Sequence, residues 1–296
     1  MDTIILAVQK VGTTMLGQLP YALGLAAFFT IVSRFSSQAC NPGRPWWKSR
    51  DLIADTHYLF ILPLILPYFS TAVAVVFMLL FWGESTMAQW PHYMTQGHGI
   101  LSGLPLYAQG IIYVVGSDFL LYWAHRLFHF DSLWPFHAVH HSAEDVDWTT
   151  TYRAHPIDNI LRFGVVKLFM LVIGISPEVS LMMVPFDILS AAFVHSNLNW
   201  TLGPLKYVIA TPVFHRWHHT SVDEGGKKNY SPTFSFWDVF FGTFYMPEGK
   251  LPQEYGNSEP NYPKDFIGQM IVPFKHIARN IAEDIRMSES AKKTKL

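Results

Sequence analysis

The stretch HRLFHFDSLWPFHAVHH, residues 125 to 141, places five histidines within 17 residues. A further cluster, HRWHH at residues 215 to 219, adds three more with the same spacing as HAVHH. Histidine is the commonest metal ligand among protein side chains. Side chains three or four positions apart on a helix lie on one face, so the imidazoles of each cluster can share a metal. The pattern therefore predicts a metal site.

The stretch at 125–141 contains two clusters, HRLFH and HAVHH, and HRWHH is the third. Ten of the chain's 14 histidines lie in these three clusters or between them. These ten are His125, His129, His137, His140, His141, His155, His195, His215, His218 and His219. The other four stand alone, and we expect them at the surface or hydrogen-bonded in the core. A zinc site takes three or four protein ligands, whereas eight to ten imidazoles suffice for two metal ions. No H-E-x-x-H or E-x-x-H motif supplies a carboxylate beside them, so we expect a dinuclear centre held by histidine.

The composition favours a membrane protein. Half of the 296 residues are hydrophobic and only 15% are charged. The net charge of −1 gives no basic field of the kind that binds nucleic acid, so no nucleic-acid partner is expected. The single cysteine, Cys40, excludes an internal disulfide framework and a cysteine-rich metal site.

Three apolar runs are long enough to cross a bilayer, which takes about 20 residues. They lie near residues 15–35, 58–82 and 101–123. A fourth apolar stretch, 159–195, is broken at Ile175-Ser176-Pro177-Glu178 and predicts an antiparallel helical hairpin, either fully spanning or re-entrant. Lys167 and Asp187 within its arms favour a hairpin that faces protein.

The distribution of basic residues predicts the orientation. The loop at 36–57 carries Arg44, Lys48 and Arg50, whereas the loop at 83–99 has no lysine or arginine. Because cytoplasmic loops are enriched in Lys and Arg, the first loop is expected in the cytoplasm and the second outside. Three spans then return the chain to the cytoplasm just before His125. The expected fold is all-α: a polytopic membrane helical bundle with a cytoplasmic histidine-rich cap that holds the dinuclear site.

HRLFH, HAVHH and HRWHH together resemble the H-x3-H, H-x2-H-H, H-x2-H-H signature of the fatty acid hydroxylase/sterol desaturase superfamily. YWAHR, RAHP at 153–156, FVHSN at 193–197 and TPVFHRWHH are also similar to that superfamily. The resemblance covers roughly residues 118–247. It implies a membrane-embedded di-iron oxygenase that uses two non-haem iron ions, O2 as co-substrate and electrons from an external donor. It also implies that His155 and His195 complete a ten-histidine ligand set.

The resemblance divides the chain into three parts. Residues 1–117 form an N-terminal transmembrane region, residues 118–247 a hydroxylase-like catalytic domain that includes the hairpin, and residues 248–296 a polar C-terminal tail. Metal-bound imidazoles usually donate their outer N–H to a carboxylate or carbonyl. The candidate carboxylates, chosen for their position in the sequence, are Asp118, Glu144, Asp145, Asp147 and Asp187. For the three that follow His141, a solvated acidic loop is an equal alternative.

The expected reaction is hydroxylation of a lipid C–H bond in a fatty acyl chain, a sterol or a related lipid that enters from the bilayer. The electron donor is expected to be a separate protein of ferredoxin or cytochrome b5 type with its reductase. A desaturase with the same di-iron site is the alternative, because the sequence does not separate the two outcomes. A His-rich metal transporter or sensor is the alternative from another class, although its ligands should lie at mid-membrane. The membrane is a bacterial inner membrane or the endoplasmic reticulum; the lipid, the donor and the oligomeric state stay open.

Overall fold

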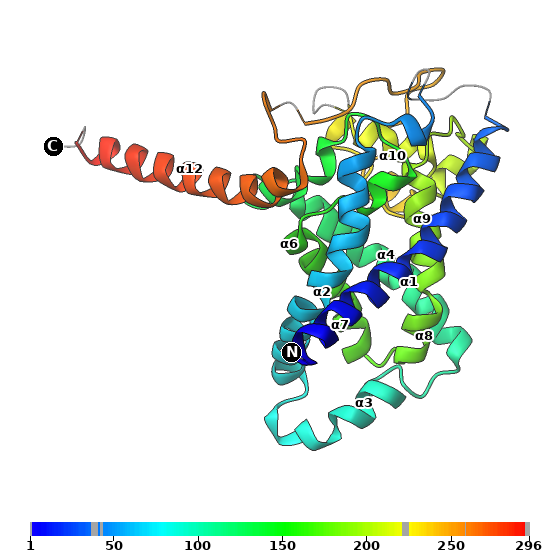
Figure 1. Ribbon diagram of the computed structural model, residues 1–296, viewed down its shortest axis with the longest axis vertical. Coiled ribbons are helices and arrows are strands. Elements are labelled where there is room, and N and C mark those ends of the chain that lie inside the picture. The colour runs from blue at the N-terminus through cyan, green and yellow to red at the C-terminus, as the bar shows by residue number, and fades with distance from the viewer. Residues whose placement is uncertain (1, 37–40, 42–43, 221–224, 258, 294–296) are drawn as a thin grey trace.

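The computed structural model describes residues 2–36, 41, 44–220, 225–257 and 259–293. These residues form α-helices with short 3-10 and π-helical turns, and no strand occurs among them. The predicted all-α class is therefore confirmed. Figure 1 shows long helices in the lower and middle part of the molecule and a cap of short elements at the upper end.

Three helices in the described part of the chain are long and apolar enough to cross a membrane: Gln9–Ser33, Leu52–Phe81 and Pro177–His195. The first lies in α1 (Asp2–Ser33) and the second is α2 (Leu52–Phe81). Both helices start before the apolar runs expected at 15–35 and 58–82. Pro20 in α1 and the two prolines of α2 lie inside continuous helices, so they do not end the spans.

The apolar run at 101–123 corresponds to α4 (Leu106–Phe128), which extends to the first histidine pair. This helix is not among the three candidate spans of the described residues. Gln109 and Asp118 lie within it and are buried, so α4 is a helix with polar internal contacts rather than a uniformly apolar span. Before it come η2 (Glu84–Gln89) and α3 (Trp90–Gln96), at the end of the molecule opposite the cap (Figure 1).

The helical hairpin predicted at 159–195 is present. Its first arm consists of α6 (Pro156–Asn159), the π-helical turn η5 (Ile160–Gly164) and α7 (Val165–Val172). Its second arm consists of α8 (Pro177–Met182), whose N-cap Ser176 accepts a hydrogen bond from Val179 N, and α9 (Val184–His195).

The turn of the hairpin packs against the loop before α4. Leu101 N donates to Ile173 O at 2.9 Å. Gly99 and Gly174 both have positive φ, and a Cβ on either would lie 2.6 Å from the backbone of the other segment. Only glycine allows two backbones to approach this closely.

The cap is built from short elements that follow one another through turns. They are η1 (Trp46–Lys48), α5 (Trp134–His137), η3 (His140–Ser142), η4 (Trp148–Tyr152), η6 (Gly203–Tyr207), α10 (Pro212–His218) and α11 (Phe236–Phe240). Two fully buried arginines hold them together. Arg153 pairs with Asp51 and Asp55 at the start of α2, at 2.9 and 2.7 Å. Arg216 donates to Val146 O at 2.6 Å and to Asn41 Oδ1 at 2.7 Å.

The last element is α12 (Phe266–Lys293), which occupies much of the segment expected as a polar tail. It leaves the body near the cap and runs outward, across the direction of α1 and α2 (Figure 1). Its first turns pack on α2, where the Phe266 and Tyr58 ring centroids are 5.0 Å apart.

Candidate metal centre

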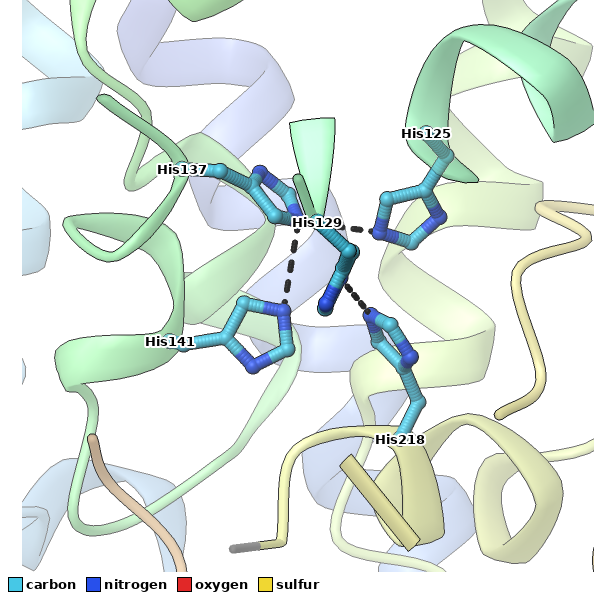
Figure 2. Close-up of side chains that lie close together, drawn as sticks. All are labelled: His125, His129, His137, His141 and His218. Carbon is cyan, nitrogen blue, oxygen red and sulfur yellow. Dashed lines mark hydrogen bonds between the residues drawn. The ribbon is translucent and has the colours of Figure 1, made fainter. Parts of the chain in front are cut away.

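Nine of the ten histidines predicted as ligands converge in the cap as two adjoining groups of buried side chains. The five-histidine group consists of His125, His129, His137, His141 and His218. The four-histidine group consists of His140, His195, His215 and His219. Within each group, one ring nitrogen per residue lies within 4.8 Å of all the others. Figure 2 shows the five-histidine group, with its rings directed toward one another.

The local helices explain how each motif serves both groups. His125 lies in the last turn of α4 and His129 is its C-cap, so the pair projects from one face. In HAVHH, the outer histidines His137 and His141 join the five-histidine group, whereas the inner His140 joins the other. HRWHH has the opposite arrangement, because its outer histidines join the four-histidine group and its inner His218 joins the five. The two motifs therefore interlock.

The outer ring nitrogens set the tautomers of several histidines. The Nδ1 atoms of His125, His140 and His218 contact the carbonyl oxygens of Tyr230, Arg153 and Lys228 at 2.7, 2.8 and 2.6 Å. His195 Nδ1 contacts Ala191 O at 2.7 Å. A carbonyl oxygen only accepts, so these imidazoles carry their proton on Nδ1 and direct an unprotonated Nε2 inward.

The inward nitrogens lie too close together to be satisfied without a cation. His195 Nε2 lies 3.1 Å from His140 Nε2. Both rings carry their proton on Nδ1, where it is donated to a backbone carbonyl, so neither Nε2 has a proton. His125 Nε2 lies 2.9 Å from His137 Nε2, whose ring binds Asp158 through Nδ1. Two lone pairs facing each other in a buried site repel, and a bound metal ion removes that repulsion. The donor set, all neutral imidazole, suits iron, zinc, copper and nickel.

Burial keeps the site in the form that binds metal. Removal from water lowers the pKa of the cap histidines well below the usual range, and neighbouring histidines lower it further where they are close. For His218, burial lowers the pKa to about 3. The imidazoles are therefore neutral at physiological pH, as metal ligation requires.

Among the residues that the structure describes, Asp158 is the carboxylate that contacts the histidine groups. Its Oδ2 lies 3.1 Å from His137 Nδ1, and both side chains are fully buried. Arg162, one helical turn later, binds Asp158 Oδ1 through Nε at 2.6 Å and Oδ2 through Nη2 at 3.1 Å. The arginine balances the buried charge, and the carboxylate orients the His137 ring.

The structure places His155 apart from the nine histidines. Its Nδ1 accepts a hydrogen bond from Ile157 N at 3.2 Å, and its Nε2 lies 3.3 Å from Met270 O. Its ring packs against Phe136 and Phe274. In this arrangement His155 caps α6 and contacts α12.

The five carboxylates predicted to support the histidines form other contacts. Asp118 accepts from Thr233 N and Phe234 N, Glu144 and Asp145 pair with Arg50, Asp147 caps η4, and Asp187 accepts from Tyr113 Oη. Their contacts in the described part of the chain do not include a histidine of the two groups. These carboxylates organise the loops and helices around the site.

Several residues that hold the centre are not evident from the sequence. Asp158 and Arg162 have helical spacing, which suggests a local ion pair but not its contact with His137. Asp238 accepts from Tyr230 N and Ser231 N at 2.8 Å each and so positions the Tyr230 carbonyl beneath His125. No sequence motif marks these contacts, since Asp158 lies 21 residues from His137 and Asp238 lies 8 residues from Tyr230.

A cavity of about 270 Å³ adjoins the histidines and continues between α4, α7 and α9. Its lining residues recur every three or four positions along α4, from Tyr113 to His125, which corresponds to a length of about 18 Å. His125, His140 and His215 line the histidine end. Its walls are largely apolar and include Phe163, Val166, Phe186, Ile188 and Val194.

The end remote from the histidines contains a polar group. Lys167 Nζ lies 3.5 Å from Asp187 Oδ2, and Tyr113 Oη donates to the same carboxylate at 3.0 Å. The two charged residues anticipated in the hairpin arms therefore pair with each other at this end of the cavity. Their pairing explains how they are accommodated in largely apolar helices.

Comparison with known proteins supports this architecture. The family model described as fatty acid hydroxylase matches residues 110–243. An ornithine lipid hydroxylase from Rhizobium tropici is 32% identical over 176 residues, which cover 59% of this chain and 53% of the relative. An alkylglycerol monooxygenase from Xenopus tropicalis is 34% identical over 147 residues, which cover 49% of this chain and 32% of the relative. A very-long-chain aldehyde decarbonylase from rice is 25% identical over 183 residues, 58% of this chain and 27% of the relative.

Residues 110–243 therefore form a fatty acid hydroxylase domain, and the relatives that match it are enzymes of the same superfamily. It spans about half of the ornithine lipid hydroxylase and about a third of the alkylglycerol monooxygenase. No solved structure matches significantly. The matched segment contains all nine histidines of the two groups.

Proposed function

We propose that the chain is a membrane-embedded, O2-dependent lipid hydroxylase whose two histidine groups each hold an iron ion. The observation that carries the proposal is the convergence of nine neutral imidazoles in two adjoining groups at the end of an apolar cavity. The superfamily and the activities for which the relatives are named support a lipid substrate. Two bound irons would supply O2 activation for attack on an unactivated C–H bond.

The chain's own residues prepare the site for that chemistry. The carbonyls of Tyr230, Arg153, Ala191 and Lys228 keep the Nδ1 protons in place, and Asp158 does so for His137. Because these contacts fix the rings, the Nε2 lone pairs point inward without reorganisation on metal binding. Burial excludes bulk water and so protects a strong oxidant from side reactions.

The cavity along α4 is the proposed substrate slot. Its apolar walls suit an acyl chain or a sterol ring system, and its histidine end places one C–H bond beside the metals. Val114 lines both this cavity and a second apolar groove between α4 and α8 that opens outward. A lipid could therefore enter sideways from the bilayer.

We further propose that the cap faces the cytoplasm. The loop with Arg44, Lys48 and Arg50 is at the cap end, and the loop at 83–99, without Lys or Arg, is at the opposite end (Figure 1). Electrons would then come from a cytoplasmic donor of ferredoxin or cytochrome b5 type. The single cysteine of the 296 residues provides no iron–sulfur cluster of its own.

The test combines metal analysis with lipid mass spectrometry. The purified protein should contain about two irons and, with a reductase system, consume O2 while a membrane lipid gains one oxygen atom. His137→Ala and His218→Ala should lose iron and activity but still insert into membranes. His155→Ala is the matched control, because His155 lies outside both groups, and it should keep its iron.

Different outcomes would overturn different parts of the proposal. A product that lacks two hydrogen atoms, with no added oxygen, would replace hydroxylation by desaturation at the same site. Tightly bound zinc, with no iron-dependent lipid oxidation, would exclude the oxygenase and favour a transport or sensing role. Full turnover in His218→Ala would refute its ligand role.

A further inference from the structure

Helix α12 has a surface that the proposed reaction does not explain. The helix is 28 residues long, and beyond its first turns it projects away from the body (Figure 1). Its attachment is specific, because the fully buried Gln269 binds Tyr58 Oη at 2.8 Å and Ser142 Oγ at 3.0 Å. The orientation of α12 is therefore set by its contacts with α2 and the cap.

One face of α12 carries a continuous apolar stripe. We call the residues Ile267, Ile271, Phe274, Ile281 and Ile285 the α12 stripe. Steps of three, four and seven residues keep them on one side of a helix. Their exposed fractions lie between 46% and 64%, whereas Phe266 and Val272 on the inner side are buried. A row of large apolar side chains is costly in water and marks an interaction surface.

Basic side chains border the stripe on one flank. At 100° per residue, Lys275, Arg279 and Arg286 all lie about 80–120° from the centre of the stripe. The acidic Glu283 lies about 160° from the centre, on the side away from the stripe, and Asp284 lies about 95° from the centre on the flank opposite the basic residues. An apolar face bordered by Lys and Arg is the pattern of a helix that rests on anionic lipid.

The position of α12 points to the same partner. Its first turn contacts the start of the α2 span, where the Phe266 and His57 rings are 6.0 Å apart. Ile53, one turn earlier on α2, is 75% exposed, so the apolar surface continues from the span to the helix. A helix that leaves the end of a span crosswise lies at the depth of the lipid headgroups.

We propose that α12 is an in-plane membrane anchor, with the stripe inserted at the headgroup–acyl boundary of anionic lipid and the basic flank against the headgroups. Because Gln269 also binds Ser142, which ends the 3-10 turn of His140 and His141, the anchor holds the cap at a fixed height above the bilayer. This inference does not depend on the reaction that the histidine centre performs.

The experiment measures the depth of single spin labels in the full-length protein. The background variant is Cys40→Ser, which contains no cysteine. Single cysteines are then introduced on the stripe by Ile281→Cys or Ile285→Cys, and away from the stripe by Asn280→Cys or Glu283→Cys. The labelled proteins are placed in phosphatidylcholine–phosphatidylglycerol vesicles. Stripe labels should collide with O2 and be shielded from an aqueous nickel chelate, and the other two should show the reverse.

Two results would overturn the proposal. Equal exposure of all four labels to nickel would mean that α12 lies in water. Shielding of the stripe labels from both O2 and nickel would mean that protein, such as a second copy of the chain, covers the stripe. Iron content and monodispersity of each labelled protein confirm that the cap is intact, and this readout is separate from lipid oxidation.

A second variant tests the basic flank. In the Ile281→Cys protein, the triple change Lys275→Glu, Arg279→Glu and Arg286→Glu should shift the label toward the aqueous phase. The shift should be larger in vesicles with phosphatidylglycerol than in phosphatidylcholine alone, because charge reversal acts on anionic headgroups. An unchanged depth in both vesicles would show that the basic flank does not contact lipid.

Discussion

Hydrogen bonds at the outer ring nitrogen of a histidine, Nδ1, decide whether the inner nitrogen, Nε2, has a free lone pair for a metal. Five of the nine rings have an Nδ1 atom in contact with a carbonyl or carboxylate oxygen. Four of these oxygens belong to the backbone, which no side-chain substitution removes. The fifth is the Asp158 carboxylate, and it is therefore the one of these five acceptors that a single substitution can remove.

Asp158→Asn tests that contact. The amide has one oxygen left to accept from His137 and carries no charge to balance Arg162. We expect a loss of metal affinity of about 10–100-fold, which is typical when a partner of a metal-bound histidine is removed. Iron titration of the purified variant measures it. Asp145→Asn, which changes a carboxylate paired with Arg50 away from the histidines, serves as the control. Equal affinity in both variants would contradict the role of Asp158.

The low pKa of His218 predicts loss of stability in acid. Its folded-state pKa of about 3 lies below the unfolded value of 6.5, so the unfolded chain binds the proton more readily. The stability present above pH 6.5 is therefore lost as pH falls from 6.5 toward 3, by about 2 kcal/mol at pH 5 for His218 alone. Thermal unfolding of the metal-free protein between pH 7.5 and 5 measures it. A midpoint that does not change over this range would contradict the prediction.

At the scale of elements, buried ion pairs join the cap to the long helices. Arg153, at the end of η4, reaches the first turns of α2 through Asp51 and Asp55, and its carbonyl accepts from His140. The same loop therefore fixes a long helix and one imidazole of the four-histidine group. The position of the metal centre relative to the spans depends on this connection.

Arg153→Met should destabilise the fold strongly, because it leaves Asp55 buried without its cation. Removal of one partner of a buried pair costs about 3–5 kcal/mol. The thermal unfolding temperature in detergent measures the loss. Lys264→Met breaks the exposed pair with Glu144 and should change it little. Adding Asp55→Leu to Arg153→Met should recover part of the stability, and a further fall would show that the charge was not the cause.

At the scale of the whole molecule, one cavity lies beside the histidines and a second, apolar groove lies on the outer side of α4 and α8. Neither arm of the hairpin forms the cavity alone, because its walls come from α4, α7 and α9 together. Val114 lines both this cavity and the outer groove between α4 and α8. Under the proposed function, access of a lipid to the histidines therefore depends on the assembled bundle.

Val114→Trp should close the proposed passage for lipid between the outer groove and the cavity. We expect the variant to retain its iron and lose lipid oxidation by about 100-fold, the scale of loss when a substrate is displaced from its reacting position. Product formation and iron content are measured together. Val115→Trp is the matched control, because Val115 lines only the outer groove. If both variants turn over as the parent does, lipid does not enter past Val114.

The sequence by itself determined the helical class, the apolar spans of α1 and α2, and the eight histidines of the three clusters, because all of these depend on local spacing. Apolar length indicates a span, and i, i+3 and i+4 offsets put imidazoles on one face. The family resemblance added His155 and His195 to these eight, but only the tertiary structure sorted nine of the ten into two groups and placed His155 apart.

The supporting contacts also depended on the tertiary structure. The five carboxylates selected for their closeness in sequence bind elsewhere, whereas Asp158, 21 residues after His137, reaches its ring. The carbonyl of Tyr230 lies 105 residues from His125. Local spacing indicates which side chains share a face of a helix. The hydrogen-bond partner of a buried ring nitrogen depends instead on how distant segments pack together, which residue spacing does not predict.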